Sequence, residues 1–240
     1  MDAMVQTYKR MNQILGSANN QKEESGVLQN VSRRGFLKLT GGIAGAGILL
    51  SACHKTPPDT IYIGSGDTAL LNYLYMMETV MAAFYTRSNA IGPQYYGLTT
   101  SELQLLADLR DHQLAHKELL VKLLGTAAIP EIVTDLSPVT FSDRTNTLNH
   151  TIMFEDLAVG AYTGAAKRFK DTTYVPLLAK MATVQARHSA YARDILAANT
   201  FSDSTIVNSN GMDQALSPVT VMTALQPYIQ THLDMTNLPA

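Results

Sequence analysis

Two stretches of the chain carry a glutamine that is followed three residues later by a histidine. The first pair is Gln113 and His116, and the second pair is Gln185 and His188. Residues three positions apart lie on the same face of an α-helix, so the two side chains of each pair can point at a common centre. Such side chains can bind a metal ion or join a buried hydrogen-bond network.

A glutamate precedes each pair and is embedded in an otherwise apolar stretch. Glu78 lies within LNYLYMMETVMAAFY, and Glu155 lies within IMFEDLAVGAY. The order Glu, Gln-x-x-His, Glu, Gln-x-x-His is therefore an internal repeat. In di-iron and di-manganese carboxylate bundles, two helices each contribute one Glu and two contribute Glu-x-x-His. This chain has the same order with glutamine in place of both motif glutamates.

Charge distinguishes two interpretations of this cluster. The candidate metal ligands are Glu78, Gln113, His116, Glu155, Gln185 and His188. Two divalent ions bring four positive charges, whereas the two glutamates neutralise only one ion, and uncompensated buried charge is costly. In the interpretation that we favour, no metal binds: the glutamine amides donate to the glutamates, and the histidines balance their charge. The alternative is a residual site for a single Fe or Mn ion.

Other polar residues near the cluster have simpler interpretations. His112 lies four residues before His116 and could share its helix face, but we expect it at the helix edge. Tyr75, Tyr85 and Tyr162 could relay electrons near a metal centre, and we expect them to pack in the core instead. The chain contains no glycine-rich phosphate loop, nucleophile elbow or CxxC motif, which argues against nucleotide and thiol chemistry.

Four long helices must position these residues. Helical periodicity predicts them at about 68–88, 100–124, 142–170 and 174–198. Thr99 and Glu102 form a capping-box motif at the start of the second. The connection at 125–141 is long enough to run the length of a bundle, whereas the other two connections suit hairpins. A short last helix over 219–229 follows Ser217 and Pro218. We therefore predict an all-α four-helix bundle with one long crossover between helices two and three.

Several segments of the chain resemble a known family. LLNYLYMMETVMAAFY, LRDHQLAHKELL, FEDLAVGAYTGAA and VQARHSAYARDIL are similar to the four helix segments of exported bacterial ferritin-like domain proteins, and SPVTVMTALQPYI is similar to their C-terminal piece. The resemblance covers about residues 68 to 230. It implies a ferritin-like fold, and it implies little about chemistry because the general activity of that family is poorly defined.

The N-terminal region has the features of an export signal. Arg33 and Arg34 precede a short apolar run, which is typical of a twin-arginine signal, and the run ends in LSAC, which resembles a lipobox with Cys53 as the lipid-bearing residue. The run is too short for a comfortable membrane span. We expect a signal segment over 1–52, a tether over 53–67 and the bundle over 68–232.

The composition of the chain limits the classes of partner that it can bind. The 240 residues carry a formal net charge of −2, so no basic nucleic-acid surface is expected. The single cysteine excludes an intrachain disulfide. We expect a protein of the cell envelope or periplasm, attached to the membrane through lipidated Cys53, and a homo-oligomer is compatible with the sequence. The favoured function is non-catalytic binding or structure, and the alternative is a metal-dependent oxidase or iron-handling protein.

Overall fold

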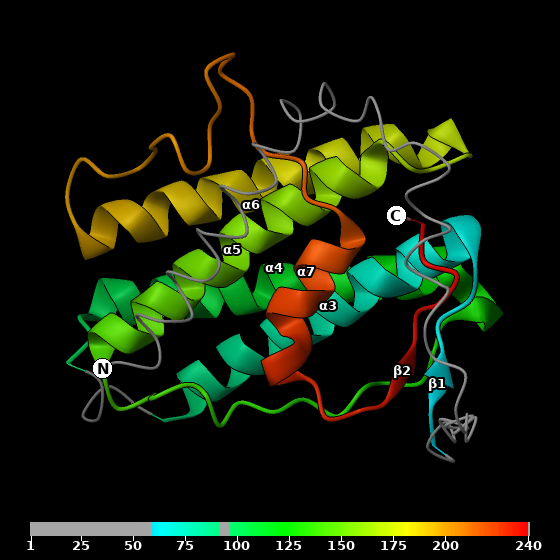
Figure 1. Ribbon diagram of the computed structural model, residues 1–240. Helices are drawn as coiled ribbons and strands as arrows, with labels where there is room; N and C mark the ends of the chain where they lie inside the picture. The colour runs from blue at the N-terminus through cyan, green and yellow to red at the C-terminus, as the bar shows by residue number, and fades with distance from the viewer. Residues whose placement is uncertain (1–58, 92–96, 240) are drawn as a thin grey trace, which may run out of the picture.

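The computed structural model describes residues 59–91 and 97–239, and four long helices form its bulk (Figure 1). They are α3 (Gly66–Ala90), α4 (Thr100–Leu124), α5 (Arg144–Ala166) and α6 (Val175–Leu196). The helices α3 and α4 pack as one hairpin, and α5 and α6 pack as a second. Contacts between α3 and α5 join the two hairpins. The predicted all-α four-helix bundle is confirmed.

A long crossover joins the two hairpins. After α4, a single 3-10 turn, η2 (Gly125–Ala127), leads into a chain that runs the length of the bundle to α5 (Figure 1). Gly125 ends α4 with φ of 55°, a left-handed conformation that suits glycine. The buried side chain of Asn72 in α3 fixes the start of the crossover, because it donates to the carbonyl of Ala127 at 3.0 Å and accepts from the amide of Ile129 at 3.1 Å.

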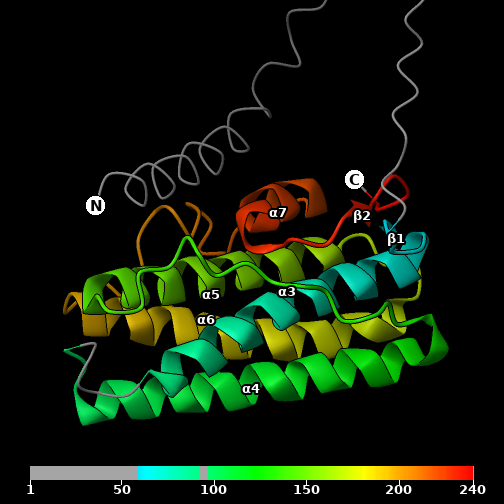
Figure 2. The ribbon, with the colours of Figure 1, turned by 90° about the horizontal axis from the view of Figure 1, so that it is seen from below.

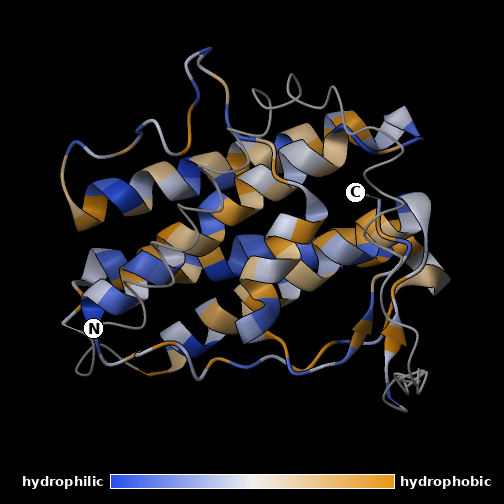
Figure 3. Ribbon diagram, viewed as in Figure 1, coloured by the Kyte–Doolittle hydropathy of each residue, from blue (hydrophilic) through white to orange (hydrophobic). Residues whose placement is uncertain are grey.

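The two hairpins bury their helices unequally. Most residues of α3 and α5 are buried on all sides, whereas α4 and α6 each keep an exposed face. The four long helices each carry both hydrophilic and hydrophobic residues (Figure 3). Glu78 and Glu155 therefore lie in the two most deeply buried helices, where an unpaired charge would be costly.

Capping fixes the ends of two helices as predicted. The Thr99 hydroxyl accepts from the amide of Glu102 at 3.3 Å, and the Glu102 carboxylate accepts from the amide of Thr99 at 2.8 Å. Arg144 at the start of α5 pairs with the same carboxylate, so the first turns of α4 and α5 are tied together. The Ser217 hydroxyl caps α7 (Pro218–Leu225), which packs against α3 and α5 on the face opposite α4 (Figure 2).

The ends of the domain differ from expectation. The last helix breaks at Leu225 into a 3-10 turn, η4 (Gln226–Tyr228). The strand β1 (Ile61–Tyr62) pairs in parallel with β2 (Leu233–Asp234), although no strand was expected. Ile63 is fully buried, so the described part of the expected tether, residues 59–67, packs as part of the domain. The strand partner lies far along the chain, and local pattern could not identify it.

The predicted signal and lipidation residues, Arg33, Arg34 and Cys53, lie outside the described residues. Within 59–91 and 97–239, no helix is both long and apolar enough to cross a membrane.

Candidate functional site

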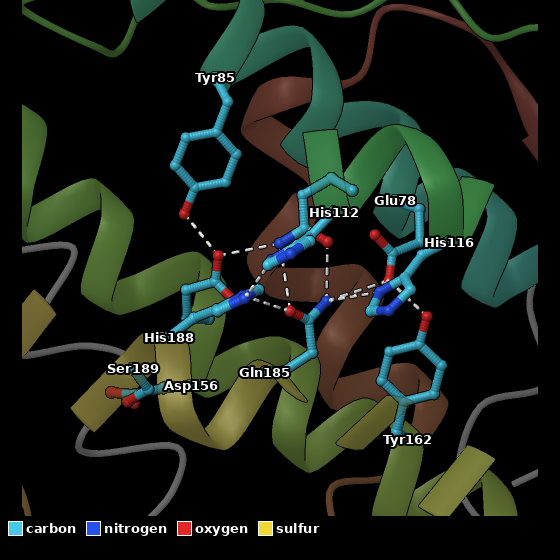
Figure 4. Close-up of polar contacts among 11 residues, drawn as sticks. Glu78, Tyr85, His112, His116, Asp156, Tyr162, Gln185, His188 and Ser189 are labelled. Carbon is cyan, nitrogen blue, oxygen red and sulfur yellow. Dashed lines mark hydrogen bonds and ion pairs between the residues drawn. The ribbon is translucent and has the colours of Figure 1, made fainter. Parts of the chain in front are cut away.

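The six predicted side chains meet at the centre of the bundle. Glu78 comes from α3 and Glu155 from α5, and both are fully buried. Gln113 and His116 come from α4, while Gln185 and His188 come from α6. Hydrogen bonds and ion pairs link all six, and most of these side chains are labelled in Figure 4. Four helices thus contribute to one polar network inside an apolar core.

The two glutamines form a reciprocal amide pair. Gln113 Nε2 donates to Gln185 Oε1 at 3.1 Å, and Gln185 Nε2 donates to Gln113 Oε1 at 2.8 Å. The same nitrogens also donate to the carboxylates, at 2.9 Å to Glu155 Oε1 and at 3.1 Å to Glu78 Oε1. A glutamine amide has two donor hydrogens, so all four are used. A carboxylate at either position could only accept, and this pattern could not form.

One histidine contacts each of the two carboxylates. His188 Nδ1 lies 3.2 Å from Glu155 Oε2 and 3.0 Å from Gln185 Oε1. Both partners are acceptors, so Nδ1 of His188 carries a hydrogen. His116 Nδ1 lies 3.5 Å from Glu78 Oε1, a longer contact. Glu155 is therefore held more tightly by its histidine than Glu78 is.

His112 joins the network from the helix edge. Its side chain is exposed, yet its Nδ1 lies 2.9 Å from Nε2 of His188, and the two rings stack at 5.0 Å with an angle of 3°. Because Nδ1 of His188 carries a hydrogen, the neutral ring accepts at Nε2, and His112 donates. Partial burial, followed by the nearby His188 and His116, lowers the pKa of His112. The sequence placed His112 at the edge correctly but did not identify His188 as its partner.

Two tyrosines, which the sequence predicted only as core residues, bind the carboxylates. Tyr85 of α3 donates to Glu155 Oε1 at 2.6 Å, and Tyr162 of α5 donates to Glu78 Oε1. They approach the network from opposite sides (Figure 4). Burial, with the adjacent glutamate as the next cause, raises the pKa of both phenols. A signal was present: each tyrosine follows the glutamate of its own helix by seven residues, two turns along the same face.

Comparison with known protein families supports this architecture. The model of the ferritin-like domain family matches residues 66–198, more than half of the chain. The chain belongs to the ferritin-like domain family. The match covers all four bundle helices and therefore every residue of the network. A search of curated proteins found no match.

The network does not fit the pair of metal ions that the ferritin-like fold implies. Only two carboxylates are present, and the amide pair of Gln113 and Gln185 stands where two further carboxylates would bridge the ions. In the described part of the chain, no three His, Cys, Asp or Glu side chains are grouped so as to hold a metal. One atom is unsatisfied: Glu78 Oε2 is buried and has no hydrogen-bond partner.

Proposed function

We propose that this ferritin-like protein is an exported, lipid-anchored binding or structural protein of the cell envelope, in which a hydrogen-bonded polar core replaces a di-metal centre. The observation that carries this proposal is the reciprocal amide pair of Gln113 and Gln185 between the two buried carboxylates. It supplies donors to both carboxylates without any cation. A buried polar network is stable only when its members are paired, and here nearly every member is.

The charge of the network agrees with a core that needs no pair of cations. Glu78 and Glu155 bring two negative charges, and a histidine ring nitrogen lies within 3.5 Å of each carboxylate. Two divalent ions would instead leave two positive charges uncompensated in a buried site. The tyrosine hydroxyls add one further donor to each carboxylate.

Metal analysis of the full chain tests the proposal. The protein is produced in medium rich in iron and manganese, dialysed, and compared with the variant Glu78→Gln, which removes one potential ligand charge and sets the background. We expect the wild type and the variant to hold the same substoichiometric amount of metal. Near-stoichiometric metal in the wild type that is lost in the variant would overturn the proposal.

The export and anchoring part of the proposal rests on sequence features alone. Arg33, Arg34 and the apolar run before Cys53 support it. Cells that express the full chain and receive a labelled fatty acid should incorporate the label into the protein. The label should be absent from Cys53→Ala, and Arg33→Lys with Arg34→Lys should keep the protein inside the cell. Label in the Cys53→Ala variant would contradict the anchor.

A second candidate function is metal-dependent oxidation or iron handling at a single residual Fe or Mn site. The observation that favours it is Glu78 Oε2, a buried carboxylate oxygen with no partner. Mixing the protein with ferrous iron and oxygen distinguishes the two functions. Our proposal expects the absorbance to rise no faster than with Glu78→Gln. A faster rise that the variant abolishes would establish the second function in its place.

A further inference from the structure

A second site lies on the outer face of α5 and α6, away from the buried network. A cavity of about 180 Å³ is lined there by the two helices, by the chain that follows α6 and by α7. That chain loops over the outside of α6 (Figure 1). Apart from Phe201, the apolar side chains that line the cavity are small or branched, among them Leu157, Val159, Ala186, Ala190, Ile206 and Val207.

Close packing holds the outer wall of the cavity in place. The amide of Leu216 donates to the carbonyl of Gly160 at 2.9 Å, and Thr163 donates to the carbonyl of Gln214 at 3.0 Å. A Cβ atom at Gly164 would lie 1.7 Å from the carbonyl oxygen of Leu216, so only glycine permits this approach. The wall is thus fixed to α5 by backbone contacts, and the cavity is formed before a ligand binds.

The acidic group beside the cavity is already paired. Asp156 and Ser189 both line it, and the Ser189 hydroxyl donates to the Asp156 carboxylate. Arg193 forms an ion pair with the same carboxylate. Figure 4 shows Asp156 and Ser189 to one side of the network, next to His188. Because Arg193 and Ser189 satisfy Asp156, the cavity offers little attraction to a cation, and an anion would enter it without a free positive partner.

We propose that this cavity binds an uncharged hydrocarbon group, the size of a single ring or a short alkyl chain. Apolar cavities of roughly 150 Å³ are large enough for a benzene ring. Phe201 lines the cavity although its side chain is 62% exposed, so the cavity reaches the protein surface beside a large apolar residue. The site shares no side chain with the buried network, and its test is independent of metal content.

The absence of tryptophan from the chain makes binding easy to follow. In the full-length variant Phe201→Trp, the only tryptophan would stand at the cavity. Titration with 1-octanol should shift its emission along a saturable curve. The matched control is Val133→Trp, which replaces another exposed apolar residue, 58% exposed and outside the cavity lining. Its emission should not change, and an equal response in both variants would overturn the proposal.

Charge and shape give two further tests in the Phe201→Trp background. Octanoate, which has the same chain length with a carboxylate, should bind at least about tenfold more weakly than 1-octanol, because an unpaired charge is costly in an apolar site. Adding Ala190→Phe should fill the cavity and abolish the response, whereas Ala115→Phe on the exposed face of α4 should preserve it. Equal affinity for the two ligands, or unchanged binding in the Ala190→Phe protein, would overturn the proposal.

A measurement on the wild type covers the outcome in which Ala190→Phe does not fold. Ligands that bind only the native state raise the melting temperature as their concentration increases. We expect 1-octanol to raise Tm at concentrations where octanoate does not. A Tm that falls with both compounds would contradict a specific site.

Discussion

The two carboxylates at the centre of the bundle occupy equivalent places in the two hairpins, and their tyrosine and glutamine donors are exchanged between the hairpins. Each glutamate accepts from one tyrosine and one glutamine of the other hairpin. The donors are Tyr162 and Gln185 for Glu78, and Tyr85 and Gln113 for Glu155. Neither hairpin can satisfy its own glutamate with these donors, so the network also joins the two halves of the bundle.

The halves differ at their histidines. His188 contacts the second oxygen of Glu155 and is itself backed by His112, whereas Glu78 Oε2 has no hydrogen-bond partner. The residue four positions before His188 is Val184, so the second pair has no counterpart of His112. The tyrosine and glutamine donors are thus present in both halves, whereas the histidine contacts differ. Both carboxylate oxygens of Glu155 have polar partners, whereas one carboxylate oxygen of Glu78 has none.

The largest effect is expected when both glutamines become glutamates. In Gln113→Glu with Gln185→Glu, the amide pair is lost and four carboxylates face one another. The metal-free protein should lose about 3–5 kcal/mol of unfolding free energy for each uncompensated charge. Mn²⁺ should then bind and restore much of that stability, which urea unfolding with and without the ion measures. A double variant that is fully stable in EDTA, with no gain in Mn²⁺ affinity, would refute the proposed arrangement.

The contrast between the halves is tested most directly by Glu78→Gln and Glu155→Gln. In Glu78→Gln, the amide nitrogen can occupy the place of the unpartnered Oε2, so about 1 kcal/mol or less is lost. In Glu155→Gln, the nitrogen replaces an oxygen that accepts a hydrogen bond, and about 1–3 kcal/mol more should be lost. Chemical denaturation provides both values. Equal losses would show that the two carboxylates are equally satisfied.

Removal of the tyrosine hydroxyls should affect both halves alike. Tyr85→Phe and Tyr162→Phe each remove one hydrogen bond to a buried carboxylate, at a cost of about 1.5–3 kcal/mol. Tyr228→Phe is the control, because this buried hydroxyl has only a weak contact with the sulfur of Met153 at 3.9 Å. Losses no larger than that of the control would mean that the phenols do not stabilise the carboxylates.

The smallest effect is a pH dependence that belongs to the Glu155 half alone. The pKa of His112 is lowered in the folded state, so the unfolded chain binds the proton more strongly. The contribution of neutral His112 to the free energy of unfolding is therefore complete above about pH 6.5, the pKa of histidine in the unfolded chain. It is lost as the pH falls below that value, through the lower pKa of the folded state. Wild type should lose more stability between about pH 7 and 5 than His112→Asn does. Parallel pH profiles would exclude a role for His112.

Much of the fold follows from short-range features of the sequence. The predicted bounds of α4, 100–124, agree with the structure because a capping box and a glycine define its two ends locally. The crossover follows from the length of the connection between α4 and α5. The pair β1 and β2 joins residues about 170 positions apart, so no local pattern could reveal it.

For the site, the sequence alone determined which polar residues face the bundle centre and that two amides leave too little charge for two ions. Helical periodicity decides this, since it depends only on residues within a few positions of one another. Only the tertiary structure decided that Tyr85 and Tyr162 cross to the opposite glutamate, that His112 meets His188 and that Glu78 keeps an unpartnered oxygen. Those contacts depend on side-chain rotamers and on how closely the helices approach, to within a few tenths of an ångström.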